Sequence, residues 1–297
     1  MSKVGIILVN YNGFNDTIKC IESLSQITYP EYAIIVVDNN SSDDSYEQLS
    51  KLDIQNYFLI KSDENVGFSG GNNIGINYAK ILQCEYVLLL NNDTLVDKDF
   101  LSALVSCAEK NDNCVAVTGK IYYACDKKRI WYAGGSFNQI TGRSVHYGIH
   151  SIDNGQFDSE KEVSFITGCC MLMPMELIDQ VGLMEEKYFL YCEDIDYCCR
   201  IRAKELKMVY DPKAIIYHKV SASTGKLHNL STYYTVRNKR IIIDNYLSGI
   251  NKIIARMYNY LEESKRILLR EYAINTVKQA RNDAKNGALG KANNINI

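Results

Sequence analysis

The sequence lacks the features that mark membrane-spanning, secreted or disulfide-stabilised proteins. No apolar run approaches the ~18 residues that are needed to cross a bilayer, and Met1-Ser2-Lys3 leads into a strand-like run without a signal-peptide core. There are 10 cysteines, but no pair has the C-x-x-C spacing, so we expect reduced, mostly buried thiols. Together these absences predict a cytoplasmic protein.

An overall excess of charge is also missing. The chain has 33 Lys and Arg against 35 Asp and Glu, a formal net charge of -2, which gives no basis for binding nucleic acid. The charges are unevenly placed, however. From Val236 to the end there are 12 basic and 5 acidic residues, a net of +7, which leaves -9 for residues 1–235.

This basic tail has the pattern of an amphipathic helix. Residues 251–285 contain neither Pro nor Gly. Apolar residues recur there at spacings of three and four: Ile253, Ile254, Met257, Tyr260, Leu261, Ile267 and Leu268. We expect this helix either to lie on an anionic membrane surface, leaving the protein peripheral on the inner face of the cell membrane, or to pack against protein, including in a homodimer.

The first hundred residues alternate strand-like and helix-like segments. Strands are expected at 4–9, 33–37, 57–60 and 86–90, and helices at 16–27, at 42–51 and from the end of a glycine-rich loop (65–73) to about residue 82. With 46% hydrophobic residues the chain can bury a large core. The order predicts an α/β fold with a mainly parallel central sheet flanked by helices.

Polar clusters follow three of these strands: Asn10-Tyr11-Asn12, Asp38-Asn39-Asn40 and Asn91-Asn92-Asp93. Because the carboxyl ends of parallel strands share one sheet edge, the clusters should converge on one crevice. A carboxylate between amides and Thr94 suits a hard divalent cation that also takes oxygens from a diphosphate. The alternative is that these Asn and Asp residues only cap a helix beginning near Lys98.

A glycine-rich segment, residues 65–73, precedes the third predicted helix. It is not G-x-G-x-x-G and has no P-loop lysine, so it supports neither a Rossmann dinucleotide site nor a Walker site. We expect its glycines to allow close backbone approach, either to a ligand or to the neighbouring strand.

Five segments together resemble the family 2 glycosyltransferases of the GT-A fold, and most closely the bacterial rhamnosyltransferases. They are residues 9–12 (VNYN), 37–41 (VDNNS), 65–73 (NVGFSGGNN), 90–94 (LNNDT) and 191–196 (YCEDID). The resemblance extends over residues 3–240. It implies a GT-A catalytic domain at 1–235, with a nucleotide-sugar-binding half at 1–118 and an acceptor-binding half at 119–235, and a basic helical extension at 236–297.

The activity that the resemblance implies is inverting transfer of a sugar, most simply L-rhamnose from dTDP-rhamnose, to a hydroxyl of a lipid-linked surface-polysaccharide precursor. The donor site would comprise Asn10, Tyr11, Asn12, Asp38, Asn40, Gly67, Asn72, Asn91, Asn92 and Asp93. Asp38 would accept the N3–H of a uracil or thymine, and Tyr11 would line the base. Asp93 and His218 would hold Mn²⁺ or Mg²⁺, although the family's D-x-D reads Asn-Asn-Asp here, which predicts weaker metal binding.

On the acceptor side, the resemblance assigns Asp194 as general base and Glu193 as acceptor-binding or supporting residue. If a helix begins at Asp194, Asp196 and Arg200 are spaced for an ion pair; the alternative is that the acids only cap this helix. Trp131, Thr167 and Gly168 are expected near the sugar, Trp131 with core packing as its alternative. Arg237 or Lys239 would bind a donor or acceptor diphosphate.

Two other functions are compatible with these motifs. One is a glycosyltransferase with another donor, such as UDP-galactofuranose or a UDP-hexose. The other is a nucleotidyltransferase or a nucleotide-sugar-binding protein that transfers no sugar. Nucleotidyltransferases carry a basic, glycine-rich loop after the first strand, whereas residues 10–15 contain no basic residue.

Overall fold

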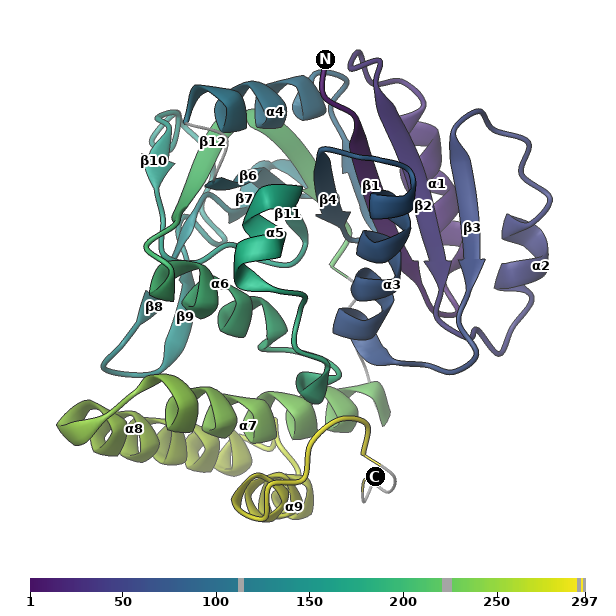
Figure 1. Cartoon of the computed structure of the whole chain (residues 1–297). Helices are drawn as coiled ribbons and strands as arrows, with labels where there is room; N and C mark the ends of the chain where they lie inside the picture. The colour runs from purple at the N-terminus through teal and green to yellow at the C-terminus, as the bar shows by residue number, and fades with distance from the viewer. Residues whose placement is uncertain (112–114, 221–225, 293–294, 296–297) are drawn as a thin grey trace.

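The molecule is built on one large twisted sheet with helices on both faces and a group of three helices below it (Figure 1). The computed structural model describes residues 1–111, 115–220, 226–292 and 295. The main sheet has ten strands, and its central path runs β10-β12-β6-β11-β4-β1-β2-β3.

The N-terminal half of the sheet is parallel. β1 (Val4–Asn10) pairs in parallel with β2 (Tyr32–Asp38) on one side and with β4 (Tyr86–Leu90) on the other, and β3 (Tyr57–Lys61) follows β2. Their side chains are aliphatic on both faces and almost wholly buried in β1, β2 and β4. The helices of this half are α1 (Phe14–Leu24), α2 (Ser45–Leu49), α3 (Gly67–Ile81) and α4 (Phe100–Lys110). The predicted strands and the first two predicted helices are confirmed, each end within three residues, whereas α3 begins at Gly67, inside the glycine-rich segment that is expected to precede it.

The second half continues the sheet. β6 (Val115–Tyr123) and β12 (Lys207–His218) are parallel to each other, and β11 (Cys170–Pro174) lies antiparallel between β6 and β4. Residues 165–173 form an apolar run of which only the second part, β11, is a strand, because the chain turns at Thr167 and Gly168. The smaller elements are β5 (Thr94–Val96), β7 (Asp126–Tyr132), β8 (Gly135–Asn138), β9 (Arg143–His146), β10 (Lys161–Glu162), α5 (Met175–Val181), η1 (Glu186–Tyr188) and α6 (Glu193–Ala203).

Three helices end the described chain: α7 (Lys226–Tyr246), α8 (Gly249–Leu268) and α9 (Ile274–Lys285). The expected domain boundary at 235/236 is wrong, because it falls inside α7, which packs on the catalytic domain and on α9 alike. The helix expected over 251–285 is two helices, α8 and α9. No helix within the described ranges has the length and apolar character to cross a membrane.

The cysteines agree with the expected reduced state over the described part of the chain. Nine cysteines are described there, all as free thiols, and eight of them are buried; Cys125 is exposed. Cys114 lies outside the described residues.

Candidate active site

The ends of β1 and β2 are tied together by buried polar groups. Asn10 donates from Nδ2 to Asp38 Oδ1 at 2.8 Å, and Thr17 Oγ1 donates to Asn10 Oδ1 at 2.8 Å. Ser41 donates to the same carboxylate from its hydroxyl, at 2.6 Å, and from its backbone N–H, at 3.0 Å. Asn10 and Asp38 have no exposed surface. Asp38 therefore holds the polar side chains at this corner of the site in place. Ser41 would have to release one carboxylate oxygen of Asp38 before the N3–H of a nucleobase could bind there.

Three other predicted residues of the donor site, Tyr11, Asn12 and Asn40, are open to solvent here. Tyr11 is 50% exposed, which leaves its ring free to line a planar ligand. Asn12, with φ 53°, accepts from the N–H of Ser42 at 2.8 Å, so its side chain fixes the loop after β2. Asn40 is exposed and also left-handed, with φ 60°. The loop conformation thus uses Asn where few other residues fit.

The glycine-rich segment forms the first turns of α3 and serves close packing. At Gly67, φ is +76°, and an added Cβ would lie 2.2 Å from the carbonyl oxygen of Phe189. At Gly75, farther along α3, it would lie 2.4 Å from Ile7 of β1. Asn72 is buried and donates to Phe68 O at 2.9 Å. These glycines therefore allow close approach to neighbouring protein segments rather than to a ligand. The Asn72 side chain is used in a hydrogen bond within α3.

At the end of β4, Asp93 meets His218 from the end of β12. His218 Nε2 lies 3.1 Å from Asp93 Oδ1, and both side chains are mostly buried. Asn91 and Asn92 hold the turn: Asn91 N donates to Cys169 O at 2.9 Å, and Asn92 Nδ2 donates to Thr17 at 2.8 Å. The chain after Asp93 enters β5 rather than a helix, and α4 begins only at Phe100. The capping alternative for Asp93 is therefore wrong.

The Asp93–His218 pair fits one divalent cation. Two ligands at right angles, each about 2.1 Å from an ion, would be about 3.0 Å apart, close to the separation found. No group of three or more His, Cys, Asp or Glu gathers at one place in the described residues. Trp131 packs against the imidazole of His218 with ring centroids 4.5 Å apart, and also contacts His146. Trp131 is half-buried, so it both packs and borders the site.

The acidic cluster joins the same site through the turn before β11. Gly168 N donates to Asp194 Oδ2 at 3.2 Å, and the adjoining Cys169 carbonyl accepts from Asn91. An added Cβ on Gly168 would lie 3.1 Å from the ring of Phe68, so this turn also touches α3. Thr167 is buried, and its hydroxyl accepts from Cys169 N at 3.3 Å. The structure thus brings the predicted metal and base residues to adjoining turns.

The loop that leads into the acidic cluster has an unusual backbone. Phe189, Tyr191 and Cys192 have φ of 62°, 66° and 71°, in a region that non-glycine residues seldom adopt. Asn238 of α7 stabilises it, donating from Nδ2 to the carbonyls of Tyr188 at 2.9 Å and Tyr191 at 2.8 Å, and also to that of Leu190. The buried Asn238 amide thus fixes the conformation of the loop, and with it the position of the carboxylates of Glu193 and Asp194 that follow.

The expected helix after this loop is confirmed as α6, and so is the Asp196–Arg200 pair, at 2.9 Å. Asp196 also accepts hydroxyls from Tyr188 and Tyr246. Glu193 is 7% exposed, and its Oε2 has no hydrogen-bond partner among the described residues. Burial raises the pKa of Glu193, and the neighbouring Asp194 charge raises it further. Burial raises the pKa of Asp194 as well, opposed by N–H donors that include Gly168.

The expected diphosphate role of Arg237 is wrong. Its side chain is 1% exposed and donates to Asn238 Oδ1 and to the carbonyls of Gly290 and Tyr188. A buried guanidinium with these partners fastens α7 and is not presented to a ligand. Lys239 is half-buried without a hydrogen bond or ion pair in the described part of the chain, and burial lowers its pKa, so its role stays a prediction.

A family model described as Glycosyl transferase family 2 matches residues 5–182. The chain belongs to this family. It is 28% identical over 216 residues to the low-salt glycan biosynthesis hexosyltransferase Agl10 of Haloferax volcanii, covering 70% of this chain and 64% of that protein. It is 26% identical over 268 residues to the rhamnosyltransferase WbbL of Escherichia coli, covering 84% and 98%. The dTDP-rhamnosyl transferase RfbF of Shigella flexneri is 22% identical over 250 residues, with 82% and 80% covered.

Solved structures of the same fold confirm the GT-A expectation. GalNAc-T7 with UDP, GalNAc and Mn²⁺ matches with a TM-score of 0.68 at 14% identity, over 96% of this chain and 55% of that one. The mannosyltransferase PcManGT from Pyrobaculum calidifontis, in complex with GDP-Man and Mn²⁺, matches with 0.59 at 14% identity, over 98% and 76%. The chain therefore spans less than two thirds of Agl10 and of GalNAc-T7. Family membership removes the basis for the nucleotidyltransferase alternative.

Several residues that build the site were not predicted. Thr17 and Ser41 complete the network around Asn10 and Asp38, and Asn73 joins α3 to Met184, donating to its carbonyl at 2.9 Å. Asn238 holds the strained loop. Thr17 and Ser41 lie within a few residues of the strand-end clusters, which is a usable signal; Asn73 and Asn238 bind segments far away in the sequence, which no local pattern reveals.

Proposed function

We propose that this chain is an inverting glycosyltransferase that moves a sugar from a nucleotide diphosphate sugar to an acceptor hydroxyl. The observation that carries the proposal is the meeting of two pairs on adjoining turns: Asp93 with His218, and Asp194 with the N–H of Gly168. The first pair suits a metal-bound diphosphate, and the second suits a base aimed at an incoming hydroxyl.

In this reaction the oxygen of the acceptor hydroxyl bonds to the anomeric carbon while the bond from that carbon to the diphosphate oxygen breaks. The bonding pair leaves with the diphosphate, and Asp194 accepts the hydroxyl proton. Asp93 and His218 would hold a divalent cation, which would supply charge neutralisation to the diphosphate, with Mn²⁺ favoured slightly by the imidazole. One base and no nucleophile gives inversion at that carbon.

Asp194 suits the base better than Glu193. Asp194 is partly exposed, and both its oxygens accept N–H groups, from Gly168 at 3.2 Å and from Ile195 at 2.8 Å, which fixes its direction. Glu193 is buried and lacks this support. We assign Glu193 to acceptor binding or to support of Asp194.

The donor we propose is dTDP-rhamnose, because the relatives include RfbF and WbbL, whose names give rhamnosyl transfer. UDP-galactofuranose or a UDP-hexose is the alternative donor. Tyr11 would line the base, with Asp38 accepting its N3–H after Ser41 rotates away. The proposed acceptor is a lipid-linked saccharide on the cytoplasmic face of the membrane, with Lys239 as the candidate contact to its diphosphate.

A thermal-shift panel of nucleotide sugars, with and without Mn²⁺, tests the donor, because a ligand that binds only the native state raises its melting midpoint. We expect the largest shift with dTDP-rhamnose plus Mn²⁺. A larger shift with UDP-galactofuranose or a UDP-hexose would replace the donor. No shift with any nucleotide sugar would contradict the function.

A further inference from the structure

The outer side of α8 is apolar. Six residues there are between 40% and 82% exposed: Ile250, Ile253, Ile254, Met257, Leu261 and Leu268. At 3.6 residues per turn they fall in one sector about 100° wide, which we call the α8 stripe. The buried residues of this helix, Ala255, Asn259 and Glu263, lie on the opposite side. The apolar side of α8 therefore does not pack against the rest of this chain, and its packing in a homodimer stays a prediction.

The inner side of α8 has specific polar partners, which fixes this orientation. Asn259 Nδ2 donates to Thr141 O at 2.8 Å, and Glu263 Oε2 accepts from Arg281 Nε at 2.7 Å. Rolling the helix to bury its stripe would break these buried contacts. The outward apolar side is thus specified by the fold.

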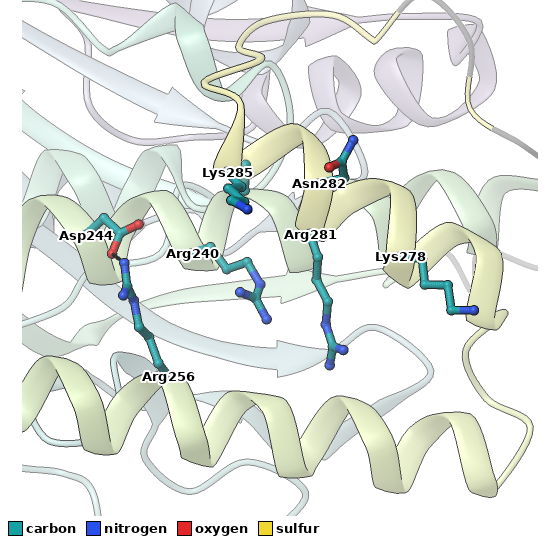
Figure 2. Close-up of a pocket in the computed structure, with 8 residues that line it drawn as sticks. Arg240, Asp244, Arg256, Lys278, Arg281, Asn282 and Lys285 are labelled. Atoms are coloured by element: carbon teal, nitrogen blue, oxygen red, sulfur yellow. Dashed lines mark hydrogen bonds and ion pairs between the residues drawn. The ribbon is translucent and has the colours of Figure 1, made fainter.

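A basic pocket of about 700 Å³ lies between α7, α8 and α9 (Figure 2). Its charged lining residues are Arg240, Asp244, Arg256, Lys278, Arg281 and Lys285. Asp244 pairs with Arg256, and Glu263 pairs with Arg281. Neither Lys278 nor Lys285 has a carboxylate at ion-pair distance among the residues that the structure describes, and both are exposed. The pocket therefore carries an excess of positive charge.

The pocket borders the stripe. Arg281 lines the pocket and packs over the ring of Tyr260 at 4.3 Å, and Tyr260 lies on α8 at one edge of the stripe. On the other edge are Tyr258 and the exposed Lys265. In a bilayer interface, apolar side chains meet the acyl chains, and Tyr, Lys and Arg side chains meet the headgroups, which is the order found across the stripe. The acidic residues of α8 lie outside the stripe.

We infer that α8 docks on an anionic phospholipid bilayer, with the stripe entering the boundary between headgroups and acyl chains and the basic pocket holding lipid phosphates. The occupant follows from charge complementarity, because an apolar face beside a pocket with an excess of positive charge fits a surface that is both apolar and anionic. The inference deepens the proposed function, since a lipid-linked acceptor would then be met at the membrane.

Flotation with vesicles tests the inference without any sugar nucleotide, so its outcome is independent of the proposed reaction. We expect binding to phosphatidylglycerol–phosphatidylcholine vesicles at least tenfold above binding to phosphatidylcholine vesicles, falling as salt rises. Met257→Asp with Leu261→Asp should lower it at least tenfold, and Lys278→Glu with Lys285→Glu should remove its salt dependence. Ile81→Asp, at an apolar residue 74% exposed on α3, and Lys51→Glu are matched controls that should bind normally.

Three results would overturn the inference. One is equal flotation of the wild-type chain with neutral and anionic vesicles. Another is calorimetric binding of inorganic pyrophosphate in the pocket with no vesicle binding, which would make it a site for a free phosphate ligand. The third is a dimer in light scattering that Leu261→Asp dissociates, which would make the stripe a contact between two copies.

Discussion

Asn238 of α7 donates a hydrogen bond to the carbonyl oxygen of Tyr191 at 2.8 Å. Tyr191 is left-handed, with φ 66°, and stands two residues before Glu193. The contact connects the C-terminal helices directly to the loop that leads into α6, which carries Glu193 and the proposed base Asp194. The helical extension is therefore part of the active site's support, although none of its described side chains is assigned to the chemistry of transfer.

Replacing Asn238 with Ala should misplace the acidic cluster. We expect kcat to fall at least tenfold and stability to fall by about 1–3 kcal/mol, because three backbone carbonyls of the loop lose the buried amide that donates to them. Nucleotide affinity should stay unchanged. Asn245→Ala, at an exposed residue of the same helix, is the control and should behave as wild type in steady-state kinetics. A normal kcat for Asn238→Ala would show that the loop holds its conformation alone.

The metal prediction concerns Asp93 and His218. EDTA and Asp93→Ala should each abolish transfer, and His218→Ala should reduce it partially, because loss of the neutral ligand leaves the charged one in place. Adding back Mn²⁺ should restore the EDTA-treated enzyme. Asp63→Ala, at an exposed acid, is the control. Full turnover in EDTA would refute the metal role.

The nucleotide prediction separates Tyr11 from Asp38. Tyr11→Ala should weaken nucleoside diphosphate binding in calorimetry with little change in melting temperature, because half of that side chain is exposed. Asp38→Ala should weaken binding and also destabilise the fold by about 1–3 kcal/mol, because Asn10 and Ser41 lose their acceptor. Unchanged affinity in a folded Asp38→Ala protein would remove Asp38 from the base site.

The sequence predicts the parallel half of the sheet well because each strand there is a short apolar run bounded by polar residues. The pairing of Asp93 with His218 comes from the family resemblance, and the structure places Asp93 Oδ1 3.1 Å from His218 Nε2. Asp196 and Arg200 were predictable because helix spacing alone brings them together.

Arg237 shows where this reasoning stops. A basic residue beside a catalytic domain suggests a phosphate ligand, but its burial depends on carbonyls of residues 188 and 290, which only the tertiary fold supplies. The orientation of α8 is similar: its periodicity predicts an apolar side, and the side that meets the protein is decided by Asn259 and Glu263. Long-range partners decide both cases.

Glu193 should make stability depend on pH. Because burial raises the pKa of Glu193 in the folded state, the folded chain binds a proton more readily than the unfolded chain does. Its contribution to stability is therefore present at acidic pH and is lost as pH rises through the raised pKa. Glu193→Gln should melt a few degrees higher than wild type at pH 8, with the difference vanishing near pH 4. A difference in melting temperature between Glu193→Gln and wild type that stayed constant from pH 4 to pH 8 would contradict the raised pKa of Glu193.

The central claim is that Asp194 removes the acceptor proton, and transfer by Asp194→Asn measured beside donor binding tests it most directly. An amide cannot accept that proton, so the rate of sugar transfer should fall by about 10²-fold or more while the affinity for the donor nucleotide is unchanged. Hydrolysis of the donor without acceptor should fall less, because water needs less help from a base once the sugar is cation-like. Near-normal transfer by Asp194→Asn together with an inactive Glu193→Gln would exchange the two roles, and activity in both variants would make this cluster a helix cap and place the base elsewhere.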